Sequence, residues 1–178
     1  MVTSRAIFLD RDGTIIQLVL NPETNHMEPP RILKDIEFCT YAIEFMKQLQ
    51  DKGYKLFIVS NQPDIAKEKQ TPQQILAVHN YIDTILIKND INITQYFYCF
   101  HHPEGTHPVH SIKCKCRKPA PGFILQAGKQ YNLDLEKSWI IGDKDTDIEC
   151  GKNAGTHGIK IGDTMSLEKA YKIISEGL

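Results

Sequence analysis

The sequence predicts an α/β fold in which a mainly parallel sheet is covered by helices on both faces. Two observations carry this prediction. Short apolar runs alternate with amphipathic stretches along all 178 residues, and the chain between successive runs is long enough for a helical crossover. Internal repeats and low-complexity segments are absent from the sequence, so we expect one domain over residues 1–178.

Five apolar runs are the expected strands. The first run, Ala-Ile-Phe-Leu, ends abruptly at Asp10, and the second, Lys-Leu-Phe-Ile-Val, ends at Ser60. The third is weaker, and the fourth ends at Gly142 and Asp143. Near-continuous apolar runs of this length are typical of strands that are buried on both faces. The expected strands cover residues 6–9, 55–59, 95–99, 138–141 and 158–161.

Helical spacing and terminal signals predict five helices. Residues 40–51 carry apolar side chains three and four positions apart, and Gly53 then ends the helix. Thr71 followed by Pro72 is an N-cap with proline at the first helical position. Residues 17–33 contain Pro, Asn and Glu without a clear period, so we expect a loop there. The expected helices cover residues 40–51, 71–87, 121–130 and 146–153, and a last one opens at Ser166.

Composition and charge exclude several classes of protein. The 21 Lys and Arg against 22 Asp and Glu give a net charge of −1, whereas a protein that coats nucleic acid needs a positive surplus. No apolar run approaches the ~18–20 residues of a membrane span. A charged triplet begins at Asp10, so no signal peptide fits before it. We expect a cytoplasmic protein without nucleic-acid or membrane partners, and a monomer because no long apolar helix face is left over.

Polar side chains follow three of the expected strands. They are Asp10, Ser60 and Asp143. In open parallel sheets the ligand site lies outside the carboxyl ends of the strands. The three side chains should therefore converge at one edge of the sheet.

The strongest motif is Asp10-Arg-Asp12-Gly-Thr directly after the first strand. Two carboxylates this close repel each other unless a cation or a proton intervenes, and Mg²⁺ is the usual hard cation with oxygen ligands. One carboxylate could then attack phosphorus and form an aspartyl phosphate. The other could protonate the leaving oxygen and later take a proton from water. The alternative is a solvated turn, since Asp and Gly are common turn residues.

Two further elements could hold a phosphate. The Ser60 hydroxyl and the following backbone N–H can bind a phosphoryl oxygen at a strand end, although Ser and Asn are also common N-caps. Residues 113–118 carry four basic side chains and no acidic one. Lys118 could neutralise the transferring phosphoryl group, and the alternative is a solvated basic loop.

A second group of acids follows the fourth strand, at positions 143, 145 and 147. Asp143 at the strand end is the expected third metal ligand. Asp147 is placed to support it or to hold Lys118. Asp145 is expected to be an N-cap or first-turn acid of the next helix rather than a metal ligand.

Three of the five cysteines lie in one histidine-containing stretch. Two close ligand pairs separated by a loop are typical of a structural tetrahedral zinc site, and generic spacing allows either His101 or His102 as the fourth ligand. Metal in this loop would fix the backbone that delivers Arg117 and Lys118. His107 and His110 are expected to be exposed rather than liganding, and the isolated Cys39 and Cys150 to pack in the core. The candidate ligands on spacing alone are Cys99, Cys114, Cys116 and one of His101 and His102.

Together these motifs resemble the haloacid dehalogenase (HAD) superfamily of phosphatases, and their order covers nearly the whole chain. The resemblance implies a Rossmann-like sheet with the first strand between the second and the fourth, and no large cap domain. It implies that Asp10 is the nucleophile and Asp12 the general acid/base. Mg²⁺ would bind the Asp10 carboxylate, the Asp12 backbone oxygen and Asp143. Ser60, Asn61 and Lys118 would hold the phosphate.

The zinc loop at 99–118, joined directly to Arg-Lys-Pro, resembles the branch that contains heptose bisphosphate phosphatases and histidinol-phosphate phosphatases. The family's zinc site uses the His101 position. The long interval between the cysteine pairs favours the heptose branch, which acts on a small phosphorylated substrate for surface glycans such as lipopolysaccharide. The implied substrate contacts are Asn61, Gln62, Arg117, Lys118 and Lys144.

Three other functions stay open on the residues alone. They are a histidinol-phosphate phosphatase, a 3′-phosphatase acting on nucleic-acid ends, and a zinc-stabilised module without catalysis. Two segments depart from the family pattern: residues 17–33 are longer than in the heptose branch, and Pro63 removes a backbone donor where a phosphate could be contacted.

Overall fold

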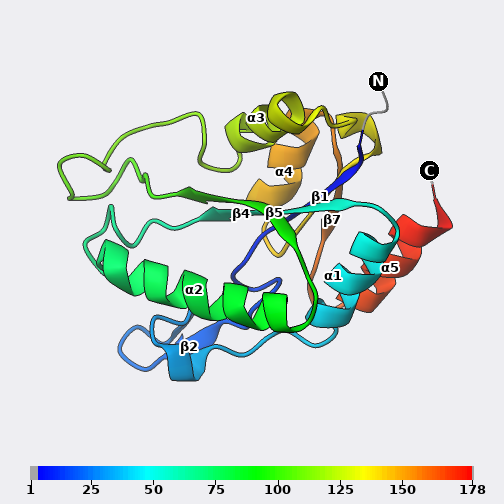
Figure 1. Cartoon of the computed structure of the whole chain (residues 1–178). Helices are drawn as coiled ribbons and strands as arrows, with labels where there is room; N and C mark the ends of the chain where they lie inside the picture. Colours follow the sequence, from blue (N-terminus) through cyan, green and yellow to red (C-terminus); the bar gives the residue numbers. More distant parts are fainter. Residues whose placement is uncertain (1–3, 178) are drawn as a thin grey trace.

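A five-stranded parallel sheet forms the centre of the protein, in a computed structural model that describes residues 4–177 (Figure 1). The strand order is β5-β4-β1-β6-β7, and every pairing is parallel. The first strand therefore lies between the second and fourth strands of the prediction, as expected. The strands are β1 (Ala6–Leu9), β4 (Lys55–Asn61), β5 (Ile93–Cys99), β6 (Trp139–Gly142) and β7 (His157–Lys160). Residues 1 and 178, the expected bounds of the domain, lie outside the described part.

Within residues 4–177, five α-helices connect and cover the strands, each within a few residues of its predicted position. They are α1 (Ala42–Asp51), α2 (Pro72–Lys88), α3 (Gly122–Tyr131), α4 (Asp145–Ala154) and α5 (Leu167–Glu176). The Thr71 side chain caps α2 in a reciprocal pair with Gln74, as the Thr-Pro signal predicts. Helix α1 begins two residues later than predicted, because Tyr41 adopts a left-handed φ of 69°.

The prediction of a loop over residues 17–33 is wrong in part. A short antiparallel hairpin forms there from β2 (Val19–Asn21) and β3 (His26–Glu28), followed by a 3₁₀ turn at Leu33–Asp35. Three-residue strands are too short to show an alternating pattern. Polar side chains tie the hairpin together, since Glu28 accepts hydrogen bonds from Asn21 and Thr24.

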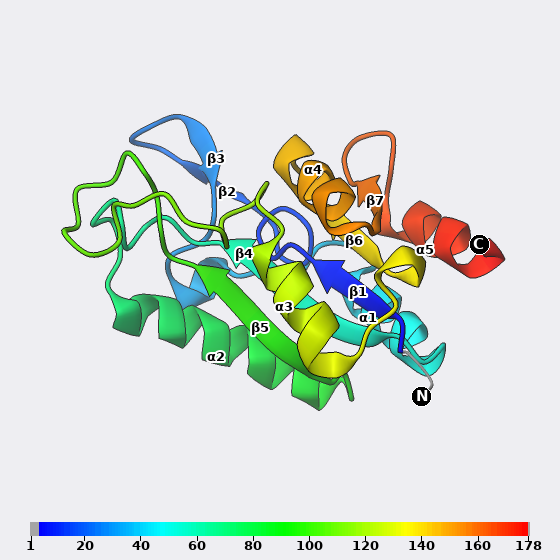
Figure 2. The same ribbon diagram turned by 90° about the horizontal axis from the view of Figure 1, so that it is seen from above.

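The helices divide between the two faces of the sheet (Figure 2). In β1, Ile7 and Leu9 point to one face, where they join the core formed with α1, α2 and α5. Ala6 and Phe8 point to the other face, against α3 and α4. Alternate side chains of a strand point to opposite faces, so a run that is apolar at every position matches a sheet covered on both sides. Cys150 is buried in the second core, and Cys39 is half-buried against the first, as expected.

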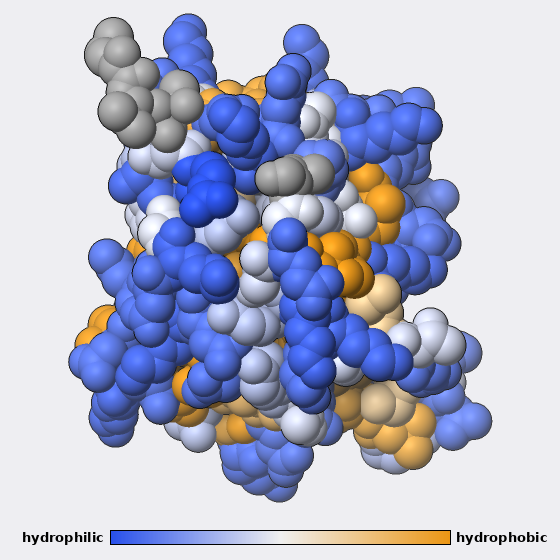
Figure 3. Space-filling model, turned by 90° about the vertical axis from the view of Figure 1, so that its right-hand side faces the viewer, coloured by the Kyte–Doolittle hydropathy of each residue, from blue (hydrophilic) through white to orange (hydrophobic). Residues whose placement is uncertain are grey.

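This arrangement leaves the carboxyl ends of three adjacent strands, β4, β1 and β6, at one edge. At the opposite end, where both described ends of the chain lie, the surface is mostly hydrophilic with small scattered apolar patches (Figure 3). None of the helices in residues 4–177 is both long and apolar enough to cross a membrane.

Candidate active site

The carboxyl edge of the sheet holds a buried lysine between two aspartates. The Lys118 Nζ lies 2.9 Å from Asp10 Oδ1 and 2.5 Å from Asp147 Oδ1. It also donates a hydrogen bond of 2.7 Å to the Val59 carbonyl oxygen. All three charged side chains are buried. Asp10, Lys118 and Asp147 are called the catalytic centre below.

The charges of the catalytic centre stabilise one another despite their burial. Burial raises the pKa of Asp10, but the charge of Lys118 and its hydrogen bond outweigh this effect and hold that pKa below its ordinary value. Burial disfavours the charged form of Lys118 as well, yet Asp10 and Asp147 raise its pKa. Asp10 is thus an ionised carboxylate at neutral pH, which is the form that a nucleophile requires.

A third carboxylate, Asp143, completes an acidic group with Asp10 and Asp147. One carboxylate oxygen from each of the three lies within 4.8 Å of the other two. Burial raises the pKa of Asp143 to about 6, and the neighbouring Asp10 and Asp147 carboxylates add to the shift. The Asp143 Oδ1 is buried without a hydrogen-bond partner. Oxygen donors that repel one another and include an unsatisfied atom fit a hard divalent cation such as Mg²⁺.

Gly13 brings the turn after β1 close to Asp143. Its φ is +86°, and a Cβ at this position would lie 2.6 Å from Asp143 Oδ2. Only glycine permits this combination of backbone angle and close approach. The Asp-Gly pair of the motif is therefore part of the site rather than a solvated turn.

The side chain of Asp12 lies apart from this acidic group. Its carboxylate accepts two hydrogen bonds of 2.9 Å from Arg11 and one of 2.6 Å from Gln62. Arg11 is buried, and Asp12 raises the Arg11 pKa although burial lowers it. Gln62 also donates to Ser60 Oγ at 2.9 Å. Sequence reasoning missed the role of Arg11, because nothing in its local pattern indicates a buried guanidinium.

Asn61 contacts the backbone of Lys118. Its side-chain amide donates to the Lys118 carbonyl oxygen at 3.1 Å, and its Oδ1 accepts from the Lys118 N–H at 3.0 Å. These bonds attach the segment that delivers Lys118 to the end of β4. Asn61 and Gln62, both expected as substrate contacts, therefore bind protein groups in this structure.

A cavity of about 320 Å³ opens above the catalytic centre. Its walls include the predicted Arg117 and Lys144, two cations suited to a small anionic ligand. Its lining also includes four residues that were not among the predicted site residues, although the sequence places Pro63 where a phosphate could be contacted. These are Pro29, Pro63, Asp64 and Thr146.

The predicted zinc ligands form one compact group beside this cavity. The Sγ atoms of Cys99, Cys114 and Cys116 lie 3.2–3.6 Å apart, and His101 Nδ1 lies 3.4 Å from Cys116 Sγ and 3.7 Å from Cys99 Sγ. Donors bound tetrahedrally at about 2.0–2.3 Å from zinc lie roughly 3.3–3.8 Å apart, so the four residues fit this ion. We call these residues the Cys/His cluster.

The other three histidines of the loop lie outside the Cys/His cluster. His102 accepts a hydrogen bond from the Glu104 N–H at 3.1 Å, so the choice of His101 over His102 agrees with the geometry. His107 and His110 were expected to be exposed, and this is wrong because both are half-buried. Their rings lie 4.7 Å apart, and the loop folds back on residues 63–70.

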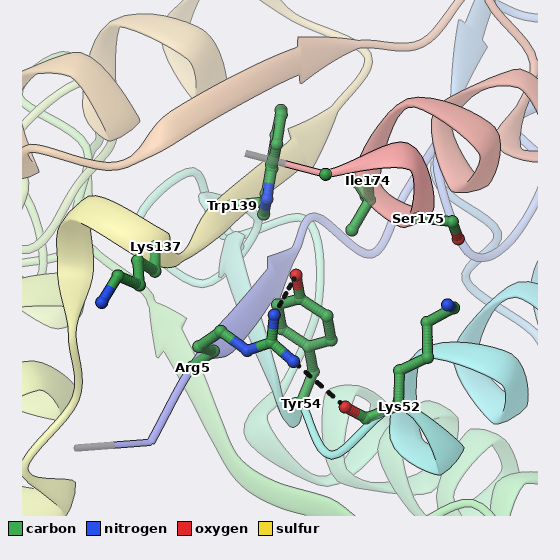
Figure 4. Close-up of a pocket in the computed structure, with 8 residues that line it drawn as sticks. Arg5, Lys52, Tyr54, Lys137, Trp139, Ile174 and Ser175 are labelled. Atoms are coloured by element: carbon green, nitrogen blue, oxygen red, sulfur yellow. Dashed lines mark hydrogen bonds between the residues drawn. The ribbon is translucent and has the colours of Figure 1, made fainter. Parts of the chain in front are cut away.

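A second cavity, of about 450 Å³, lies at the opposite end of the sheet (Figure 4). Arg5 and Lys137 line it together with Trp139, with Lys137 pointing away from the other labelled side chains, and no carboxylate is among its described lining residues. Arg5 donates hydrogen bonds to the Tyr54 hydroxyl and the Lys52 carbonyl oxygen. This cavity has cations without a nucleophile or a metal-binding group, so the smaller cavity is the candidate active site.

Known proteins with similar sequences and folds agree with this choice. Residues 115–168 match the family model described as HAD-hyrolase-like. The chain is 36% identical over 151 residues to a D-glycero-alpha-D-manno-heptose-1,7-bisphosphate 7-phosphatase from Photorhabdus laumondii, an alignment that covers 85% of this chain and 78% of that protein. The chain belongs to the HAD superfamily, in the family of these heptose bisphosphate phosphatases. It is therefore a phosphoric monoester hydrolase.

Two solved structures share the fold of this HAD enzyme. A HAD-like phosphatase from Mesorhizobium loti has a TM-score of 0.83 at 26% identity, covering 99% of this chain and 88% of that one. The D,D-heptose 1,7-bisphosphate phosphatase from B. bronchiseptica, complexed with magnesium and phosphate, has a TM-score of 0.74 at 20% identity, covering 97% of this chain and 87% of that one.

Proposed function

We propose that this HAD enzyme is a Mg²⁺-dependent phosphatase that removes the 7-phosphate of D-glycero-D-manno-heptose 1,7-bisphosphate. The observation that carries the chemistry is the catalytic centre, in which an ionised Asp10 lies beside a buried Lys118 at the carboxyl end of β1. The observation that carries the substrate is the 36% identity to a relative named for this reaction.

In the proposed mechanism Asp10 attacks phosphorus and forms an aspartyl phosphate, and the sugar oxygen leaves. Asp12 gives this oxygen a proton and later takes one from the water that hydrolyses the aspartyl phosphate. Lys118 stabilises charge on the phosphoryl oxygens, and Ser60 donates a further hydrogen bond. Arg11 and Gln62 hold the Asp12 side chain through three hydrogen bonds, of which Oδ1 accepts one, so this oxygen keeps a second lone pair for the proton.

Mg²⁺ would be held by the Asp10 and Asp143 carboxylates and the Asp12 backbone oxygen. When bound, it supplies positive charge that offsets the repulsion between the aspartates and the phosphate. The unsatisfied Asp143 Oδ1 and the raised pKa of this group support the assignment. Asp147 keeps Lys118 in place through their ion pair.

Zinc in the Cys/His cluster has a structural role in this proposal. Cys116 immediately precedes Arg117, which donates to the His101 carbonyl oxygen at 3.3 Å, and then Lys118. Holding the loop with metal fixes the backbone that positions both cations. Arg117 and Lys144 then contact the second phosphate of the substrate.

Histidinol phosphate is the second candidate substrate. Its organic part carries a cationic amine, which Arg117 and Lys144 at the cavity wall would repel. The two anionic groups of a sugar bisphosphate suit these cations better.

Steady-state kinetics of the purified protein with Mg²⁺ tests the assignment. The substrates are both anomers of heptose 1,7-bisphosphate and histidinol phosphate. We expect kcat/KM for one heptose anomer to be at least about tenfold higher than kcat/KM for histidinol phosphate. The second phosphate of the heptose substrate would gain two additional charge contacts, with Arg117 and Lys144. An equal preference for histidinol phosphate would contradict the proposed substrate while leaving the chemistry in place.

The cytoplasmic location and the monomeric state stay predictions from the sequence. Size-exclusion chromatography with light scattering tests the second, with one species of about 20.3 kDa expected.

A further inference from the structure

The β2–β3 hairpin is joined to the segment that follows β4 by one arginine. Arg31 Nε donates to Asp64 Oδ2 at 2.9 Å, and its Nη2 donates to Glu28 Oε2 at 2.7 Å. Glu28 in turn holds the hairpin through Asn21 and Thr24. We call this set, Glu28, Arg31 and Asp64, the Arg31 bridge. It connects residues more than thirty positions apart in the sequence.

The segment that carries Asp64 is also attached to the zinc loop. The Ala66 carbonyl oxygen accepts hydrogen bonds from the N–H groups of Thr106 and His107, at 2.8 and 3.1 Å. The Thr106 hydroxyl donates to Glu68 at 2.6 Å. In Figure 1 this segment, residues 62–71, runs between the hairpin and the zinc loop. The three loops therefore form one connected wall.

This wall encloses the side of the cavity away from the catalytic centre. Pro29, which follows β3, lines the cavity together with Pro63 and Asp64. Asp64 is the one acidic lining residue that belongs to neither the catalytic centre nor the Asp-Arg-Asp motif, within the described chain. Its side chain is 16% exposed, so it is partly accessible from the cavity.

The Asp64 carboxylate is unexpected in a site for a doubly anionic substrate. Unpaired, it would repel the phosphates, but Arg31 offsets its charge at 2.9 Å. Burial disfavours the charged form of Arg31, and the hydrogen bond and charge of Asp64 nevertheless raise its pKa. Asp64 Oδ2 accepts the hydrogen bond from Arg31, and Asp64 Oδ1 accepts none from the described residues. A carboxylate oxygen is an acceptor, and the groups of a sugar phosphate that can donate to it are its hydroxyls.

We propose that Asp64, held in place by Arg31, is a specificity-determining residue that accepts a hydrogen bond from a hydroxyl of the organic part of the substrate. This inference rests on the proposed function and assigns a role to the two segments that depart from the family pattern. The hairpin supplies Arg31, and Pro63 fixes the backbone next to Asp64 with its constrained φ. Selectivity then comes from loops, as expected for an enzyme without a large cap.

The test compares two phosphoesters in variants of the bridge. One is heptose 1,7-bisphosphate, and the other is p-nitrophenyl phosphate, whose organic part has no hydroxyl. The variants are Asp64→Asn, Arg31→Gln and the double variant. We expect the ratio of the two kcat/KM values to fall about tenfold in each single variant, because a site built for a hydroxyl loses discrimination when its acceptor is weakened or displaced. The KM of the heptose substrate should rise more than its kcat falls.

The double variant should lose no more selectivity than the stronger single variant, since both remove one coupled interaction. Arg31→Lys, which keeps the charge without the two-pronged geometry, should restore part of the ratio. Lys172→Gln is the matched control. It breaks the exposed Lys172–Glu168 pair on α5 and should leave both substrates unaffected.

Thermal unfolding of each variant shows that the fold is retained. An unchanged ratio in folded Asp64→Asn, or an equal loss for both esters, would overturn the inference. If the wild type instead prefers histidinol phosphate, the proposed function fails. Histidinol phosphate has no free hydroxyl, so the role of Asp64 would fail with it, whereas an unchanged ratio in an enzyme that prefers the heptose substrate would overturn the role of Asp64 alone.

Discussion

The catalytic centre gathers residues from distant parts of the chain, whereas the Cys/His cluster comes from one loop, and the two satisfy their polar groups differently. Lys118 lies between two carboxylates and donates to a carbonyl oxygen, so its charge is compensated by the protein itself. The Cys/His cluster is joined mainly by sulfur–sulfur and sulfur–imidazole contacts of 3.2–3.7 Å, with one longer contact of 4.0 Å from Cys99 Sγ to the His101 carbonyl oxygen. Thiols are weak hydrogen-bond partners, so the zinc ion proposed above would supply most of the strength of this cluster. We therefore expect the catalytic centre to lose stability or activity when one of its side chains is changed. The Cys/His cluster should lose stability when a side chain is changed and also when the metal ion is removed.

The largest expected effect is the loss of the nucleophile. Asp10→Asn keeps the shape of the side chain but cannot form the aspartyl phosphate. We expect kcat for any phosphoester to fall at least about a thousandfold, with the fold retained. The assay is phosphate release together with circular dichroism.

Asp145→Asn is the matched control for this change, because Asp145 is an exposed acid whose partner is the surface residue Lys160. It should keep kcat within about twofold of the wild type. Residual turnover in Asp10→Asn above about one per cent would contradict the covalent route.

The next largest effect is on stability, from the buried lysine. Lys118→Met leaves Asp10 and Asp147 buried without their cation. Breaking a buried ion pair in this way costs about 3–5 kcal/mol in the free energy of unfolding. Urea denaturation in the absence of Mg²⁺ measures it.

Adding Asp147→Asn to Lys118→Met should recover part of this loss, since it removes one of the two unpaired charges. A Lys118→Met protein as stable as the wild type would show that the ion pairs contribute little.

The Cys/His cluster should respond to the ion as well as to the side chain. Treatment with a strong zinc chelator, or Cys114→Ser, should lower the melting temperature by several degrees and reduce kcat, as Arg117 and Lys118 lose their fixed backbone. Metal analysis should find about one zinc per chain in the wild type.

His102→Gln, in the same loop but outside the Cys/His cluster, is the control and should keep the zinc. An unchanged melting temperature in a zinc-free protein would mean that the loop holds itself together without metal.

The smallest effect concerns pH. Burial lowers the pKa of His79 below its ordinary value of 6.5, with Asp83 opposing and Arg11 adding to the shift. The unfolded chain therefore binds a proton more readily than the folded one, so stability should fall as pH drops through 6.5. His79→Gln should flatten the change in melting temperature between pH 7 and about pH 5. If the melting temperature of His79→Gln changed with pH as steeply as that of the wild type, the pH dependence would come from other groups.

Local patterns predicted the strands, the helices and the residues at strand ends. The rule that parallel strands end at one edge was enough to place Asp10, Ser60 and Asp143 together. The Cys/His cluster could also be predicted, because close cysteine and histidine pairs at the two ends of a loop are typical of a metal site. The β2–β3 hairpin was missed because strands of three residues carry no period.

The sequence by itself determined the order of the elements, the chemistry available at the strand ends and the set of candidate metal ligands, since each depends on spacing along the chain. Tertiary structure alone decided that Arg11 and Gln62 hold Asp12, that Asn61 anchors the Lys118 backbone, and that Arg31 joins two loops over the cavity. Apart from the contact between the sequence neighbours Arg11 and Asp12, these contacts join segments that are distant in the sequence and meet only through packing. No local pattern encodes such a pairing, because one polar residue in a loop has the same neighbours in sequence whether or not a partner folds against it.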